Sequence, residues 1–137
     1  MGRQAVKIGV DTNVLLRAAV RDDPRQAVSA AHVLRTAELV AIPVAALCEF
    51  AWVMRSMYKR PAPEVARSIR LLVTSPNVVT HLPAVEAGLA VLDQGGDFAD
   101  GAIAFEGRWL GADEFVSFDK QAVNLLKALG RRARLLS

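Results

Sequence analysis

Residues 5–17 have the sequence Ala-Val-Lys-Ile-Gly-Val-Asp-Thr-Asn-Val-Leu-Leu-Arg, in which a short apolar run changes to helical spacing at Asp11. The first part, up to Val10, predicts a short buried strand. From Thr12 onward the apolar residues recur with the period of a helix. Asp11 therefore lies at the carboxyl end of a predicted strand, which is where ligands bind in open α/β sheets.

Further strand-like runs alternate with helical segments along the rest of the chain. After 5–10, the predicted strands are 39–42, 77–80, 114–118 and an edge strand at 133–136. The predicted helices are 12–19, 24–38, 43–58, 83–92, 97–110 and 119–129, with one more from the Pro61 and Pro63 pair to about 74. This alternation favours parallel strands joined by right-handed crossovers. We therefore expect an α/β fold, in which helices flank a central, mostly parallel sheet of four to five strands, and a single domain over residues 1–137.

The composition is that of a globular protein. The chain has 137 residues, of which 53% are hydrophobic, and this is enough for the core of one domain. No apolar run approaches the roughly 18 residues of a membrane span, and the first residues do not resemble a signal peptide. Cys48, the single cysteine, has no partner for a disulfide within the chain, which fits a reducing compartment. We therefore expect a cytoplasmic location.

Charge is distributed unevenly along the chain. Residues 1–70 carry 11 Lys and Arg against 6 Asp and Glu, whereas residues 71–137 carry 6 against 8. A basic surface beside an acidic pocket suits a metal-dependent nuclease, because the substrate is a polyanion and the metal needs carboxylates. Solvated helix faces explain the basic residues equally well, since no dense Lys/Arg run occurs. Charge supports a nuclease without deciding the question.

Four acidic residues, Asp11, Glu49, Asp100 and Asp119, lie at the ends of apolar segments far apart in the sequence. Because Asp11 and Asp119 directly follow predicted parallel strands, we expect both carboxylates to point into one crevice. Clustered carboxylates are typical ligands of a hard divalent cation. Helix capping is the alternative for three acids, and Asp100 could complete a capping box that begins at Asp97.

Glu49 lies inside a segment that is apolar nearly all round, with Ala-Ala-Leu-Cys before it and Phe-Ala-Trp-Val after it. An unpaired charge buried there would cost several kcal/mol. The carboxylate therefore needs a cation, a hydrogen-bond partner or a water-filled cleft, and a pairing arginine is the alternative. A shared metal site would account for all four acids at once.

Four motifs occur in order along nearly the whole chain: Val-Asp-Thr-Asn-Val-Leu-Leu-Arg at 10–17, Glu49, Asp-Phe-Ala-Asp at 97–100 and Ser-Phe-Asp at 117–119. Together they closely resemble the PIN-domain ribonucleases, in particular the VapC-type toxins of bacterial toxin–antitoxin pairs. The resemblance implies a PIN-like three-layer sandwich and an endoribonuclease that hydrolyses RNA phosphodiester bonds with Mg²⁺ or Mn²⁺. It implies a catalytic, metal-binding quartet of Asp11, Glu49, Asp100 and Asp119.

The resemblance also implies supporting roles for four further polar residues, which are Thr12, Asn13, Asp97 and Ser117. Two departures from the family pattern occur in the segment 97–110. Gly101 replaces an alanine that is common there, and Gly107 is an additional glycine. Because glycine disfavours helix, we expect the two to loosen this helix without affecting the acids.

Candidate RNA contacts are Arg17, Arg21 and Arg25, which follow the first acid in the sequence. Their guanidinium groups could bind phosphates in a bidentate manner. A solvated helix face explains these arginines at least as well. Nothing in the sequence encodes base recognition, so the target RNA is not predicted.

The helix 43–58 carries more bulky apolar side chains than one core-facing stripe accommodates, among them Trp52 and Met57. Such a surplus usually marks a partner site, although a place in the core explains it equally well. The resemblance favours a groove for a VapB-like antitoxin and a homodimer contact. Elsewhere we expect Trp109 and Phe115 to lie in the core.

Three other functions compete with a nuclease. A haloacid dehalogenase-like phosphatase would use Asp11 as its nucleophile, but its motif requires a second aspartate where this chain has Asn13. A receiver domain requires a lysine late in the chain, and Lys120 is misplaced because it lies directly beside Asp119. A PIN-like module that binds RNA or protein without cutting remains as the third alternative, although degenerate modules lose acids that this chain retains.

Overall fold

The computed structural model describes residues 4–137, and every predicted strand and helix is present there. The first half comprises β1 (Gln4–Gly9), α1 (Thr12–Val20), α2 (Pro24–Thr36), β2 (Ala37–Ala41), α3 (Val44–Ser56), α4 (Ala62–Val73) and β3 (Val78–Val79). The second half comprises α5 (Leu82–Asp93), α6 (Phe98–Trp109), β4 (Phe115–Ser117), α7 (Lys120–Ala128) and β5 (Ala133–Leu135). The α/β fold class is therefore confirmed. None of the helices in this part of the chain is long and apolar enough to cross a membrane.

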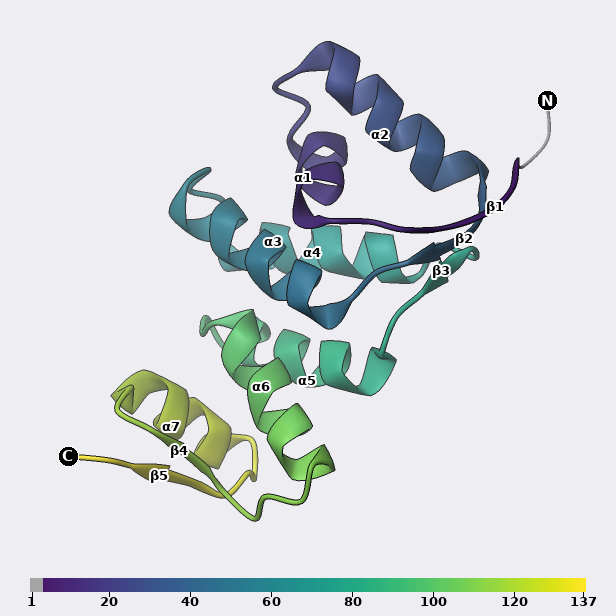
Figure 1. Ribbon diagram of the computed structural model, residues 1–137. Coiled ribbons are helices and arrows are strands. Elements are labelled where there is room, and N and C mark those ends of the chain that lie inside the picture. Colours follow the sequence, from purple (N-terminus) through teal and green to yellow (C-terminus); the bar gives the residue numbers. More distant parts are fainter. Residues whose placement is uncertain (1–3) are drawn as a thin grey trace.

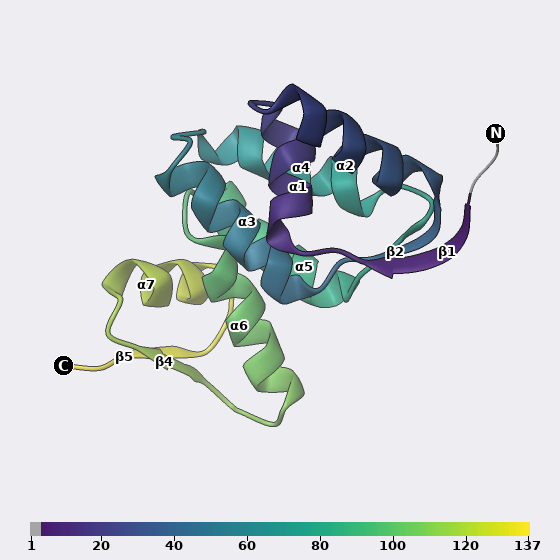
Figure 2. The same ribbon diagram turned by 45° about the horizontal axis from the view of Figure 1, so that its top comes forward.

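The strands form two separate sheets, whereas we predicted one sheet of four to five strands. Strands β1, β2 and β3 form a parallel sheet in that order, and β4 pairs in parallel with β5. We call residues 113–137, which contain β4, α7 and β5, the C-terminal unit. In both views it lies at the opposite end of the molecule from β1 (Figures 1 and 2). Strands β4 and β5 are close in sequence, so their pairing closes a shorter loop than pairing with β1 would.

The helix predicted at 24–38 ends earlier, at Thr36, because β2 begins at Ala37. Ala37 is paired with Gln4 in the parallel ladder, and Leu39 is paired with Lys7. Alanine and glutamate favour helix locally, so here the pairing of β2 with β1 outweighs the local preference.

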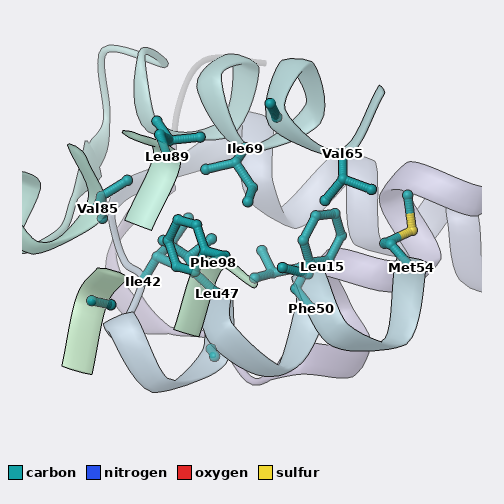
Figure 3. Packing of buried hydrophobic residues seen from close by; sticks show 14 of the residues in the cluster. Leu15, Ile42, Leu47, Phe50, Met54, Val65, Ile69, Val85, Leu89 and Phe98 are labelled. Atoms are coloured by element: carbon teal, nitrogen blue, oxygen red, sulfur yellow. The ribbon is translucent and has the colours of Figure 1, made fainter. Parts of the chain in front are cut away.

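The larger hydrophobic core lies between the three-stranded sheet and helices α1, α3, α4, α5 and α6. Leu15, Phe50 and Phe98 have no exposed surface in it. Figure 3 shows Phe98, from the first turn of α6, beside Leu47 of α3 and Ile42, which directly follows β2. Full burial of such a side chain contributes roughly 1.5–3 kcal/mol. Phe98 therefore anchors the start of α6, where two of the acids lie, to the sheet.

A smaller core joins α5 and α6 to the C-terminal unit. Its buried members are Val91, Ala104, Val123, Leu126 and Ala133, and Phe115 packs against them. Phe115 is therefore in a core, as predicted. The prediction for Trp109 is wrong, because this residue is 73% exposed, although its ring makes a T-shaped contact with the His81 ring. Trp109 is the last residue of α6.

Helices α5 and α6 cross in close contact at two glycines. A Cβ at Gly101 would clash with the main-chain carbonyl of Ala87, and a Cβ at Gly88 would lie 2.6 Å from the Phe98 ring. Helix α6 runs unbroken through Gly101 and Gly107, and the loosening expected from the two glycines stays a prediction. Gly101 permits the close approach of the two helix backbones.

Candidate active site

The start of α1 and the middle of α3 bring Asp11, Thr12 and Glu49 together. Asp11 follows β1 and caps α1, because its side chain accepts the N–H of Val14 at 3.1 Å. The buried hydroxyl of Thr12 donates to Oε1 of Glu49 at 2.5 Å. Asp11, Thr12 and Glu49 line one hollow of about 440 Å³. Two of the four predicted acids therefore share a cleft.

Glu49 is exposed to solvent and does not lie inside an apolar environment. From the sequence, the Glu49 carboxylate needed a cation, a hydrogen-bond partner or a water-filled cleft. The structure provides a hydrogen bond from Thr12 and an open hollow. Within residues 4–137 no arginine pairs with this carboxylate. The Glu49 carboxylate is therefore oriented by Thr12 and remains accessible.

A second acidic group lies at the starts of α6 and α7. Asp97 caps α6 by accepting the N–H of Ala99 at 3.1 Å, and Asp119 caps α7 by accepting the N–H of Ala122 at 3.2 Å. Asp100 is in the first turn of α6, and its side chain accepts no hydrogen bond from the described residues. Capping therefore accounts for Asp97 and Asp119, whereas the predicted capping box does not form.

The surroundings of Asp100 favour its protonated form. Partial burial, together with the negative charges of Asp97 and Asp119, raises the pKa of the Asp100 carboxyl to about 6. Burial penalises the charged form of a carboxyl, and neighbouring acids repel it. A cation beside Asp100 would stabilise the charged form against both effects, so this acid is a candidate for a ligand or a proton carrier.

The two acidic groups meet between α3 and α6, where Glu49 and Asp97 line a hollow of about 580 Å³ with Cys48 and Glu106. Burial, helped by the charges of Asp97 and Glu106, raises the pKa of the Cys48 thiol to about 11. Glu106 was not singled out from the sequence. The sequence signal that could have identified Glu106 is its position seven residues after Ala99. This spacing places Ala99 and Glu106 on the same face of α6, the face that meets α3.

The four predicted ligands are not assembled around one point in this conformation. In residues 4–137 no three His, Cys, Asp or Glu side chains lie close enough to hold a metal ion. Asp119 is carried by the C-terminal unit, and β4 does not pair with β1, so Asp11 and Asp119 do not follow neighbouring strands. Carboxylate oxygens are suitable ligands for a hard divalent cation, but in this conformation the four side chains are too far apart to bind one ion together. Their role as ligands stays a prediction.

The residues expected to support the acids lie beside them. Thr12 contacts Glu49 as described, and Oγ of Ser117 accepts the N–H of Asp119 at 2.9 Å, which holds the start of α7. Asn13 lines the hollow that Asp11 and Glu49 share. The supporting roles that the family resemblance implied for these residues stay a prediction.

The three arginines proposed as RNA contacts differ in availability. Arg17 lines a hollow with Asp11 and Asn13, but it also forms an ion pair with Asp22 at 2.9 Å. Arg21 ends α1 in the left-handed conformation, with φ of 60°. Arg21 and Arg25 are both exposed and form no ion pair within the described part of the chain. Arg21 and Arg25 are therefore more available to a phosphate than Arg17.

Comparison with known families matches the chain to the PIN domain over residues 8–128. The matched range covers most of the chain and includes all four acids. The chain belongs to the PIN domain family. PIN domains are generally nucleases and typically use divalent metal ions, so membership supports a hydrolase at this general level. No curated protein matched the chain.

Membership of the PIN domain family sets aside the phosphatase and receiver-domain alternatives. The choice between a cleaving and a non-cleaving PIN domain depends on the acids themselves. None of the four acids that the family resemblance implied forms an ion pair within residues 4–137. Asp11 and Glu49 also share a hollow that is large enough for an ion and several waters.

Proposed function

We propose that this PIN domain is an endoribonuclease that depends on Mg²⁺ or Mn²⁺ and acts as the toxin of a toxin–antitoxin pair. The observation that carries the proposal is Asp100, a half-buried carboxyl whose pKa is raised to about 6 by burial and by Asp97 and Asp119. Like charges gathered in a partly buried place are unfavourable unless a cation offsets them. Perturbed carboxyls in clefts are therefore typical of functional sites.

Neighbouring groups hold one carboxylate oxygen of Asp11 and one of Glu49, and they leave the other oxygen of each side chain free to bind a ligand. The N–H of Val14 holds one carboxylate oxygen of Asp11, and Thr12 holds one oxygen of Glu49, so the second oxygen of each side chain is available. Asp100 has both oxygens available and can keep a proton near neutral pH. When bound, a divalent cation would polarise the phosphate and lower the pKa of an attacking water.

The test is RNA cleavage by the full-length chain with Mn²⁺. Asp11→Asn, Glu49→Gln, Asp100→Asn and Asp119→Asn are each expected to slow cleavage roughly 100-fold or more, while the overall shape is kept. Asp113→Asn, which neutralises an exposed acid in the loop before β4, is the matched control and should cleave normally. Undiminished cleavage by the Asp11 and Asp100 variants would refute these roles.

The second candidate function is a PIN domain that binds RNA or protein without cutting. The observation that favours it is the spacing of the acids, since no three of them converge in the described residues. Calorimetric titration with Mn²⁺, followed by incubation with structured RNA, separates the two functions. Binding of the ion without any cleavage would favour the non-cleaving module.

We also propose a homodimer and a VapB-like antitoxin as partners. The support is the α3 segment, in which Trp52 is 56% and Met57, at its C-terminal end, is 68% exposed. Exposed large apolar residues on one helix are unusual unless a partner covers them. Light scattering of the purified chain tests the dimer, and copurification with the product of a neighbouring small gene tests the antitoxin.

A further inference from the structure

A hollow lined by three arginines lies where α5 and α6 meet the C-terminal unit. Its volume is about 110 Å³, and Arg108, Arg131 and Arg132 line it together with Phe105 and Phe115. No acidic residue of the described chain lines it. The other lining residues are apolar, so the three arginines supply all the charge among the residues that line the hollow, and this favours a bound anion.

The guanidinium groups of these arginines are not used elsewhere. Within residues 4–137, Arg108, Arg131 and Arg132 form no ion pair, and all three are exposed. Arg108 lies over the Phe105 ring, 5.9 Å from its centroid, and this contact leaves its N–H donors available. The fork of a guanidinium group matches the oxygens of a phosphate.

The backbone holds Arg131 and Arg132 in fixed positions. Gly130, with φ of 80°, ends α7 and turns the chain toward β5. The N–H of Arg131 then donates to the carbonyl of Leu126 at 2.8 Å, and the carbonyl of Arg132 accepts the N–H of Phe115 at 3.0 Å. These two arginines therefore belong to an ordered turn between α7 and the paired strands β4 and β5.

Helix α6 connects this hollow to the acids. Asp100 is in its first turn and Arg108 in its last, a separation of about 12 Å along the helix axis. Gly101, Ala104 and Arg108 lie along one side of α6 and line the hollow. Gly101 and Ala104 are buried, so an RNA strand cannot lie along this side of α6, but a strand that passes both ends of the helix would meet the acids at one end and the arginines at the other.

We propose that Arg108, Arg131 and Arg132 form a binding site for a backbone phosphate of single-stranded RNA, at a distance from the phosphate that the acids attack. This inference rests on the proposed ribonuclease function and adds how its substrate is positioned. Positive charge near the ends of α6 and α7 also stabilises those helices through their dipoles. That structural role accounts for one cation at each helix end, but it does not require three around one hollow.

RNA binding is measured first, by fluorescence anisotropy with a labelled single-stranded oligoribonucleotide in EDTA, where metal-dependent cleavage cannot occur. Arg131→Gln/Arg132→Gln in the full-length chain removes both charges, keeps polar side chains and is expected to bind about tenfold more weakly. Arg108→Gln is the independent second variant. The slope of log affinity against log salt should become shallower by about 0.7 for each phosphate that the variant no longer neutralises.

Arg67→Gln is the matched control, because Arg67 is an exposed arginine on α4 without an ion pair in the described residues. It should bind RNA like the unmodified chain. Weaker binding by the hollow variants at unchanged Tm supports the proposal. Binding equal to that of the control overturns it, as does a fall in affinity that merely follows a fall in Tm.

Cleavage with Mn²⁺ is measured separately, so that the two proposals can fail independently. We expect the hollow variants to raise KM about tenfold and to leave kcat nearly unchanged, since they remove binding away from the reacting phosphate. An unchanged KM overturns the phosphate site and leaves the ribonuclease proposal intact. Absence of cleavage by the unmodified chain, with the arginine dependence of binding preserved, overturns the ribonuclease proposal alone.

Discussion

The three-stranded sheet and the C-terminal unit differ in how firmly they are anchored. The sheet is packed by a core that includes Leu15, Phe50 and Phe98, all without exposed surface. The C-terminal unit is attached through fewer buried residues: Val123 and Leu126 are the largest fully buried side chains that it contributes, and its one aromatic residue in this core, Phe115, is only partly buried. Large aromatic side chains dominate core energetics, so the first region is held by more burial than the second.

This difference bears on the candidate site, because the acids are divided between the two regions. Asp11 and Glu49 belong to elements of the larger core, whereas Asp119 starts α7 in the C-terminal unit. Asp100 lies between them on α6 and responds to the charge of Asp119. The spacing of the quartet therefore depends on the less firmly packed region.

The largest effect expected from this comparison is on core stability. Phe98→Ala should lower the free energy of unfolding by about 3–5 kcal/mol, and Leu126→Ala by about 2 kcal/mol, because the smaller core can collapse around the gap. Urea denaturation measures both. Hydrogen exchange should accelerate throughout the chain in the first variant and mainly within residues 113–137 in the second. Equal losses of stability in the two variants would contradict the difference in anchoring.

The next effect concerns the crossing of α5 and α6, which joins the two regions. Gly101→Ala forces a methyl group against the Ala87 carbonyl and should cost about 1–3 kcal/mol of unfolding free energy. Gly107→Ala on the same helix meets open space and should gain about 0.5–1 kcal/mol. Thermal and urea unfolding of the pair provide the measurement. If Gly101→Ala left the free energy of unfolding unchanged, the two helices would be able to move apart at their crossing without loss of stability.

A smaller effect is expected from the pH dependence of Asp100. Its pKa is about 6 in the folded chain against an ordinary value of 3.8, so the stabilising protonated form is lost as pH rises through about 6. In EDTA at pH 7, Asp100→Asn should therefore raise Tm by roughly 2–4 °C, after allowance for solvent screening. The gain should vanish near pH 4. Differential scanning fluorimetry from pH 4 to 8 checks this, and an equal gain at both ends would exclude titration as its cause.

The smallest effect expected is on the reactivity of Cys48. Burial first, and then Asp97 and Glu106, raises its pKa to about 11, so alkylation at pH 8 should be slow. Asp97→Asn should speed it roughly twofold to threefold, because one repelling charge is removed while burial persists. Iodoacetamide labelling followed by mass spectrometry gives the rate. No change in that rate would mean that α6 does not hold Asp97 beside α3 in solution.

Local features of the sequence predicted the elements well. The Asp11 junction, the prolines directly before α3 and α4, the proline in the first turn of α5 and the glycine after α7 each mark a boundary through the chemistry of a few neighbouring residues. The same features cannot determine which strands pair. Phe115–Ser117 has the same pattern whether it pairs with β1 or with β5, and this is where the prediction of a single sheet is wrong.

The candidate site was predictable in its residues and not in its geometry. The hydrogen bond from Thr12 to Glu49 joins residues 37 positions apart, and it depends on how α3 packs beside α1. The raised pKa of Asp100 arises from burial at the start of α6, together with the charges of Asp97 and of Asp119, which starts α7. The arginine hollow likewise combines α6 with the turn after α7, whose relative placement no local pattern encodes.

Helix capping by Asp11, Asp97 and Asp119 has a consequence for how such a chain can change over generations. Each carboxylate starts a helix as well as carrying charge, so replacement by an apolar residue would cost about 0.5–2 kcal/mol even in a copy without nuclease activity. Asparagine caps equally well and carries no charge. In descendants that have lost catalytic activity, asparagine should therefore accumulate at these three positions, whereas Asp100, which caps no helix, should be replaced by residues of many kinds.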